Sequence, residues 1–83
     1  MDERRGEARH RTLKAGTIEF KHAGGISCTV RNLSNAGACL EVVSPLGIPD
    51  DFTLAIESDH VARQCHVRWR AANRIGVAFH RQH

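Results

Sequence analysis

The sequence alternates between apolar and polar residues in short segments, and turn-forming residues separate these segments. Apolar side chains recur at every second position, as in Phe52, Leu54 and Ile56, whereas the spacing that marks an amphipathic helix is scarce. Successive side chains of a strand point to opposite faces, so this period places one face of each segment in a core. The pattern predicts six strands, at residues 17–21, 26–33, 38–43, 52–56, 61–71 and 75–80.

Clusters of turn-forming residues separate the predicted strands. Residues 32–37 combine asparagine, serine and glycine, and residues 44–50 contain Pro45 and Pro49. Proline lacks a backbone N–H and fixes φ, so residues 44–50 are predicted to form a connecting loop. Six short strands that begin about a dozen residues apart, without a helical period, are typical of an all-β antiparallel barrel or a curled sheet.

The chain has 83 residues, which suffices for one small domain with a single core. Hydrophobic residues make up 41% of it and charged residues 25%, a balance that excludes both a disordered polyelectrolyte and a membrane protein. No run of about 20 apolar residues is present for a spanning helix, and no apolar run follows the charged N-terminus as in a secretory signal. We therefore expect a soluble, folded, cytoplasmic domain that does not associate with a membrane.

The sequence carries no pattern that indicates catalysis or a bound metal. A Gly-x-Ser-x-Gly motif, a Walker loop and tyrosine are absent, and the adjacent Asp50 and Asp51 are expected to be an exposed strand cap. Cys28, Cys39 and Cys65 form no Cys-x-x-Cys pair, and the histidines lack metal-binding spacing. We expect reduced cysteines, no cofactor, no metal and no enzymatic activity.

Charge is segregated along the chain. Residues 1–14 hold five of the twelve Lys and Arg, residues 61–83 hold another five and no acid, and residues 41–60 hold five acids without a Lys or Arg. Two basic segments separated by an acidic one indicate a one-sided positive field that attracts a phosphate ligand. Residues 1–13 have little apolar surface to bury, so we expect a flexible arginine-rich arm, followed by one barrel domain over residues 14–83.

The first motif suited to a nucleotide lies in the arm. Arg5 and Arg9 are four residues apart, and Arg4 directly precedes them. A guanidinium binds phosphate through two parallel hydrogen bonds and also stacks on aromatic rings, so paired arginines suit a nucleotide. A solvated charged tail is the alternative interpretation of these residues.

The second motif is the turn Asn32-x-Ser34-x-x-Gly37. Asn32 and Ser34 offer side-chain donors and acceptors on alternate residues, and therefore on the same strand face. Gly37 adds a backbone freedom that other residues lack. An ordinary turn between two strands is the alternative interpretation.

The two motifs together are more specific than either alone. An Arg-x-x-x-Arg arm followed by Asn-x-Ser-x-x-Gly on a small all-β chain resembles the PilZ domain family of bacterial cyclic di-GMP receptors. Residues 67–69 and 75–79 also resemble the closing strands of that family. The resemblance implies a six-stranded antiparallel barrel of the split-barrel type, with the arm folded over the ligand at the outer face. It further implies a stand-alone receptor that relays the signal to a downstream protein.

The resemblance also implies roles for the residues of the two motifs. Arg5 and Arg9 would hold phosphate and stack on guanine. Asn32 and Ser34 would hydrogen-bond the guanine edge, and Asn32 keeps an acceptor where Asp is more frequent in the family. Gly37 would let the turn approach the base.

Three further expectations follow from the resemblance. Trp69 occupies a position from which family members sometimes pack a base, with ordinary packing as the alternative. An arginine directly before the arm motif tends to accompany an intercalated ligand dimer, and Arg4 stands there, so we expect two cyclic di-GMP molecules per chain. The sequence ends shortly after Phe79, so the long C-terminal helix of many members is expected to be absent, which leaves the oligomeric state open.

Two other functions compete with this interpretation. A small basic β-barrel can bind single-stranded nucleic acid, but such proteins stack bases on exposed aromatic rings. This chain has only three phenylalanines, on apparent core faces, and one tryptophan, which weighs against nucleic acid as a partner. A protein-interaction module that binds no nucleotide is the other alternative.

Overall fold

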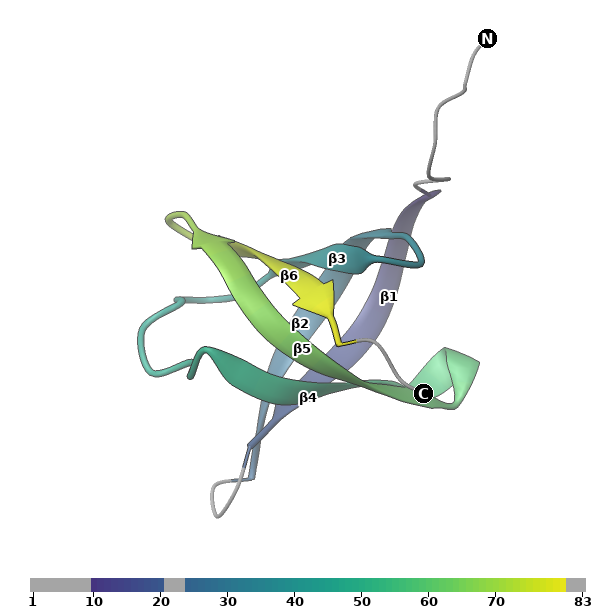
Figure 1. Ribbon diagram of the computed structural model, residues 1–83, viewed down its shortest axis with the longest axis horizontal. Helices are drawn as coiled ribbons and strands as arrows, with labels where there is room; N and C mark the ends of the chain where they lie inside the picture. The colour runs from purple at the N-terminus through teal and green to yellow at the C-terminus, as the bar shows by residue number, and fades with distance from the viewer. Residues whose placement is uncertain (1–9, 21–23, 81–83) are drawn as a thin grey trace, which may run out of the picture.

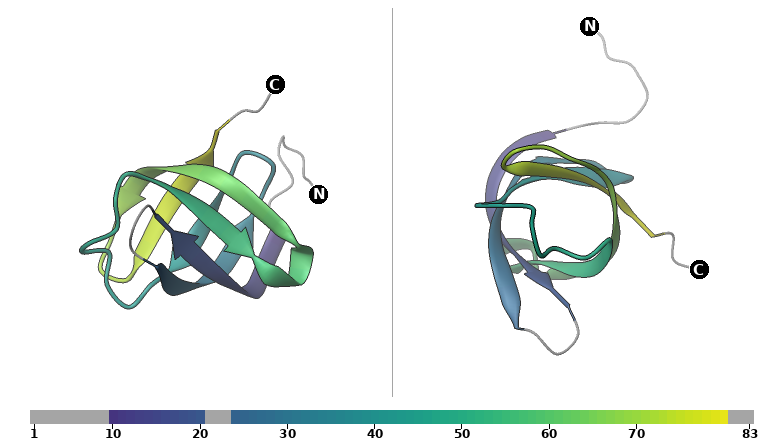
Figure 2. Two further views of the ribbon diagram at one scale, coloured as in Figure 1. Left: turned by 90° about the horizontal axis from the view of Figure 1, so that it is seen from below. Right: turned by 90° about the vertical axis from the view of Figure 1, so that its left-hand side faces the viewer.

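The computed structural model describes residues 10–20 and 24–80. In this part of the chain six antiparallel strands close into a barrel, with neighbours in the order β1-β2-β3-β6-β5-β4 (Figures 1 and 2). The predicted fold class, a six-stranded antiparallel barrel, is confirmed. The elements are β1 His10–Glu19, β2 Gly25–Leu33, β3 Gly37–Glu41, β4 Asp51–Ile56, the 3₁₀ turn η1 Glu57–Asp59, β5 Val61–Arg70 and β6 Arg74–Phe79.

The first strand is longer than its sequence pattern suggests. β1 begins at His10, opposite Leu33 of β2, and runs to Glu19, opposite Gly25. Residues 10–13, which the sequence analysis assigned to the arm, therefore lie in the strand. Backbone pairing with β2 satisfies the peptide groups of this polar segment without burying apolar side chains. The predicted flexibility of residues 1–9 lies outside the described residues.

Every strand contributes at least one side chain that is fully buried in the barrel. These seven residues are Ile18, Val30, Leu40, Leu54, Ile56, Cys65 and Ile75. Burial of a large aliphatic side chain stabilises a fold by about 1.5–3 kcal/mol, so this layer is the main source of stability in a small domain. No helix among the described residues is long and apolar enough to cross a membrane.

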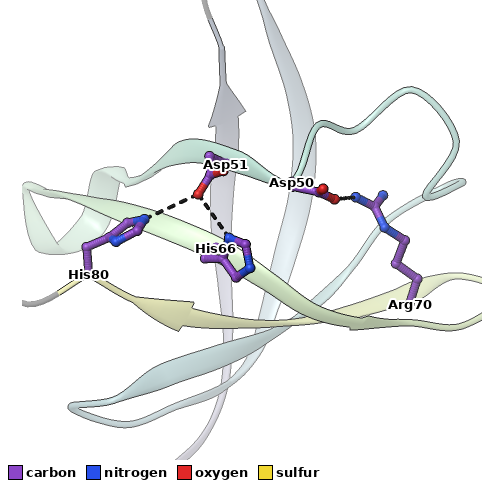
Figure 3. A network of polar contacts seen from close by, with 5 residues as sticks. All are labelled: Asp50, Asp51, His66, Arg70 and His80. Atoms are coloured by element: carbon purple, nitrogen blue, oxygen red, sulfur yellow. Dashed lines mark hydrogen bonds and ion pairs between the residues drawn. The ribbon is translucent and has the colours of Figure 1, made fainter.

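The loop between β3 and β4 is held in place by one arginine of β5. Arg70 donates from Nη1 to the carbonyl oxygens of Pro45 and Ile48, at 3.1 and 2.9 Å. It also donates from Nη2 to Asp50 Oδ1 at 2.8 Å (Figure 3). The Ile48 side chain is buried in the core. The predicted loop over residues 44–50 is therefore confirmed. The hydrogen bonds of Arg70 and the buried side chain of Ile48 hold it against the barrel.

Two histidines share one carboxylate beside this loop. His66 Nδ1 lies 3.0 Å and His80 Nε2 lies 3.3 Å from Asp51 Oδ1, which joins β5 and the end of β6 to β4 (Figure 3). The hydrogen bond with His66, followed by the one with His80, holds the pKa of Asp51 below its ordinary value. Asp51 is exposed at the start of β4, as expected for a strand cap.

We predict that Asp51→Asn reduces the sensitivity of the fold to acid. Because the pKa of Asp51 is lower in the folded state than in the unfolded chain, its carboxylate stabilises the fold above about pH 4, and this contribution is lost as the pH falls through the folded-state pKa. Urea midpoints of the parent should therefore fall more steeply below about pH 4 than those of Asp51→Asn. Glu57→Gln, at an exposed acid of η1, is the matched control, and identical pH profiles for Asp51→Asn and the parent would contradict the assignment.

Candidate functional site

Two β-bulges turn two of the predicted site residues onto the outer surface of the barrel. The pairing of β2 with β3 shifts at Arg31, just before Asn32, and the pairing of β5 with β6 shifts at Arg68, just before Trp69. A bulge inserts one extra residue into a strand, so the residue after it faces the side opposite to the one that simple alternation predicts. Both bulges thus aim the following side chain away from the core.

The bulge in β5 corrects one expectation from the sequence. Simple alternation over the predicted strand at residues 61–71 puts Trp69 on the same face as Cys65 and Val67. That placement is wrong, because Cys65 is fully buried and Val67 packs against the core, whereas Trp69 is 48% exposed. The apolar–polar alternation of a sequence does not show where a strand contains an extra residue. The alternation of residues 61–71 therefore could not reveal the bulge at Arg68.

The two bulges align four residues in one row across four strands. Asn32 of β2 is opposite Cys39 of β3, Cys39 is opposite Gly76 of β6, and Gly76 is opposite Trp69 of β5. With about 4.8 Å between neighbouring strands, the row is about 14 Å long. The indole of Trp69 lies over Gly76, where any Cβ atom would overlap the ring. Gly76 therefore lets the ring lie against the barrel wall.

A hollow of about 310 Å³ lies over this row and beside the β2–β3 turn. Its volume is at the lower end of the usual range for ligand sites. The hollow brings together the four predicted site residues that the structure describes, and Arg4, Arg5 and Arg9 lie outside the described residues. The polar, aromatic and glycine residues that line it include Asn32, Ser34, Gly37, Cys39, Arg68 and Trp69.

Ser34 holds the β2–β3 turn in shape. Its hydroxyl accepts hydrogen bonds from the backbone N–H groups of Ala36 and Gly37, both at 3.2 Å, and donates to the Gly37 carbonyl at 3.3 Å. A hydroxyl has one proton and two lone pairs, so these bonds use its full capacity. Ser34 thus shapes the wall of the hollow, and its direct contact with a guanine edge stays a prediction.

Gly37 is required by packing rather than by an unusual backbone conformation. Its φ is not in the left-handed region, which among the described glycines is adopted by Gly24 and Gly47. A Cβ atom at Gly37 would overlap the carbonyl oxygen of Val77 in β6. The backbone freedom expected of this glycine is therefore not used, and its lack of a side chain brings the turn against β6.

Two lining residues escaped the sequence analysis. Arg68 faces the hollow because it is the extra residue of a bulge, and Cys39 faces it because β3 runs between β2 and β6. The sequence repeats Val-Arg before both Asn32 and Trp69. This repeat is the one feature of the sequence that could have indicated a bulge in each of the two strands. Among the described residues, no group of three or more His, Cys, Asp and Glu side chains could hold a metal ion.

We predict that Cys39 is the fast-reacting cysteine of the folded protein. Burial raises the pKa of Cys28 to about 11 and that of Cys65 to about 12, and both thiols are enclosed in the core, whereas Cys39 is only partly buried. Because the thiolate is the nucleophile, a disulfide reagent at about pH 8 should modify one thiol quickly and two slowly. Cys39→Ser should remove the fast phase, and a fast phase that persists in this variant would refute the placement of Cys39.

The comparison with known protein families agrees with this geometry. The family model of the PilZ domain matches residues 3–83, which is nearly the whole chain. A search of the curated proteins finds no significant match. PilZ domains are receptor modules for cyclic di-GMP rather than enzymes, and the match covers both the described barrel and the arm that precedes it. This chain belongs to the PilZ domain family.

Proposed function

We propose that this protein is a cytoplasmic cyclic di-GMP receptor that binds the dinucleotide between the N-terminal arginine arm and the Asn32–Gly37 turn, and then relays the signal to a partner protein. The observation that carries the proposal is the convergence of the turn and Trp69 on one hollow, although Gly37 and Trp69 are 32 positions apart in the sequence. The bound state is the signal, so the protein needs no catalytic residues of its own.

The hollow is suited to one guanine base. The exposed indole of Trp69 offers a flat apolar surface on which a base can stack, a contact worth about 1–3 kcal/mol. The amide of Asn32, at the other end of the row, offers both donors and an acceptor to the hydrogen-bonding edge of the base. Stacking at one end and hydrogen bonding at the other favour a planar ligand with a polar edge.

The first strand begins next to this hollow. His10, the first residue of β1, is opposite Leu33, which directly precedes Ser34 of the turn. β1 therefore begins one strand spacing, about 5 Å, from the end of β2 beside the predicted base site. The guanidinium groups of the arm, which precedes β1 in the sequence, are chemically suited to hold the phosphates of a ligand seated in the hollow.

Single-stranded nucleic acid is supported less well as the ligand. Phe52 is buried, and Phe20 and Phe79 pack against the core, so the described barrel offers Trp69 as its one strongly exposed aromatic side chain. Proteins that bind single strands without sequence preference stack successive bases on a series of such side chains. One stacking surface fits a compact dinucleotide better than an extended strand.

We predict that cyclic di-GMP changes the fluorescence of Trp69. The chain contains one tryptophan, so its emission reports on this position alone. A stacked guanine should quench the emission in a saturable way, and the melting temperature should rise because the ligand binds the folded state selectively. GMP should bind far more weakly, since it offers a single base and cannot engage the arm and the turn together. A flat calorimetric titration with cyclic di-GMP would refute the proposed function.

We also predict that Arg5→Ala and Arg9→Ala each weaken binding by one to two orders of magnitude. Each change removes charge-assisted hydrogen bonds worth about 1.5–3 kcal/mol. The melting temperature of the free protein should stay nearly unchanged, because these residues precede the first strand. Arg63→Ala serves as the control for net charge, since Arg63 stacks on the Phe79 ring, 4.2 Å from its centroid, and does not line this hollow. If Arg9→Ala binds as tightly as the parent, the arm is a solvated tail.

A further inference from the structure

Arg68 is the one charged residue among the described residues that line the hollow beside the β2–β3 turn. The other described residues around this hollow are polar, apolar or glycine, and none of them is Asp or Glu. Arg68 is exposed, and neither sequence motif includes it. A guanidinium has five N–H donors and no acceptor, so Arg68 takes its acceptors in this hollow from a ligand or from water.

The two bulges each add one arginine, and the two arginines have different surroundings. Arg31, in the β2 bulge, donates from Nη1 to Glu41 Oε1 at 3.1 Å and does not line this hollow. Arg70, two residues after Arg68 in β5, is held by Asp50 and the β3–β4 loop. Within residues 10–20 and 24–80, Arg68 pairs with no carboxylate. Of these three arginines, Arg68 is therefore the one that faces the ligand site.

The strand register places Arg68 at the tryptophan end of the row. Arg68 lies in the bulge between Val67 and Trp69, and Trp69 is opposite Gly76 of β6. Asn32 lies at the other end of the row, on β2, with β3 and β6 between it and β5. Arg68 and Asn32 therefore approach a base in the hollow from different strands, so the two side chains are suited to different edges of that base.

The chemistry of an arginine matches one edge of guanine in particular. Guanine presents two adjacent acceptors, O6 and N7, on the edge that it turns toward the major groove of a duplex, and a guanidinium donates two parallel hydrogen bonds to them. Adenine presents the N7 acceptor and an N6 amino donor on the same edge. An arginine at this edge therefore meets two acceptors in guanine, but one acceptor and one donor in adenine.

We propose that Arg68 binds O6 and N7 of the guanine base that stacks on Trp69, and that it thereby selects guanine over adenine among cyclic dinucleotides. This inference rests on the proposed function and adds the residue that determines its base specificity. Asn32 remains assigned to the other hydrogen-bonding edge of the base. Lysine cannot replace Arg68 in this role, because an ammonium group is a point charge without the planar fork.

The test is a double-mutant cycle between Arg68 and the N7 atom of the ligand. Parent and Arg68→Lys are titrated by calorimetry with cyclic di-GMP and with its 7-deaza analogue, in which C–H replaces N7. The analogue should bind the parent about tenfold more weakly than cyclic di-GMP. In Arg68→Lys the two ligands should bind nearly equally, because the contact that N7 makes is already lost. A contact of Arg68 with a phosphate would leave the tenfold difference in both proteins.

A change of specificity is the second measurement. The side-chain amide of glutamine has a donor and an acceptor, which suit N7 and N6 of adenine. Arg68→Gln should therefore reduce the preference for cyclic di-GMP over cyclic di-AMP about ten- to hundredfold. Arg31→Gln is the matched control, since it changes the corresponding bulge arginine outside this hollow, and it should keep the preference of the parent. Thermal melts check that Arg68→Gln and Arg68→Lys are folded, which is expected for an exposed residue.

The outcomes separate this inference from the proposed function. A parent that binds no cyclic di-GMP overturns both. A parent that binds cyclic di-GMP, with an N7 replacement that has the same effect in the parent and in Arg68→Lys, overturns the role of Arg68 alone. An Arg68→Gln variant that keeps the preference of the parent for cyclic di-GMP over cyclic di-AMP also overturns it.

Discussion

Closure of the barrel through the β1–β4 ladder is the constraint on which the rest of the structure depends. Gly16 to Glu19 pair with Thr53 to Ile56, which turns an open sheet into a cylinder without free edges. Closure crowds the interior at Gly16, where a Cβ atom would lie 3.2 Å from the side chains of Cys28, Val30 and Leu54. With the interior filled, every polar function of the chain has to lie on the outer wall, at the barrel ends or in the segments beyond the strands.

The two bulges place polar and aromatic side chains on the outer wall at positions that would otherwise face the filled core. A regular strand next to a filled core can offer only its outward residues, at every second position, and the positions of Asn32 and Trp69 would otherwise point inward. One extra arginine in each of two strands reverses these side chains and leaves the core residues before them in place. The site is thus made by local irregularity in two strands that do not neighbour each other.

The sequence predicts the fold well and the site only in part. The alternation of Phe52, Leu54 and Ile56, and of similar sets, reveals strands and core because burial imposes that period. The family motif picks out Asn32, Ser34 and Gly37. The start of β1 at His10 was missed, since backbone pairing alone holds that segment and leaves no apolar period to detect. The orientation of Trp69 was missed because a bulge depends on pairing between strands distant in sequence.

Gly37 and Gly76 differ in the atoms that an added Cβ would meet, and this difference affects how such a domain can evolve. The obstacle above Gly37 is a backbone carbonyl of the neighbouring strand, which cannot move without disturbing the barrel. The obstacle above Gly76 is the exposed indole of Trp69, which is a side chain rather than backbone. A side chain gained at position 76 would therefore displace the exposed indole and spare the fold. Under the proposed function, this single mutation would remove the stacking surface for the ligand and leave the barrel as a scaffold open to other uses.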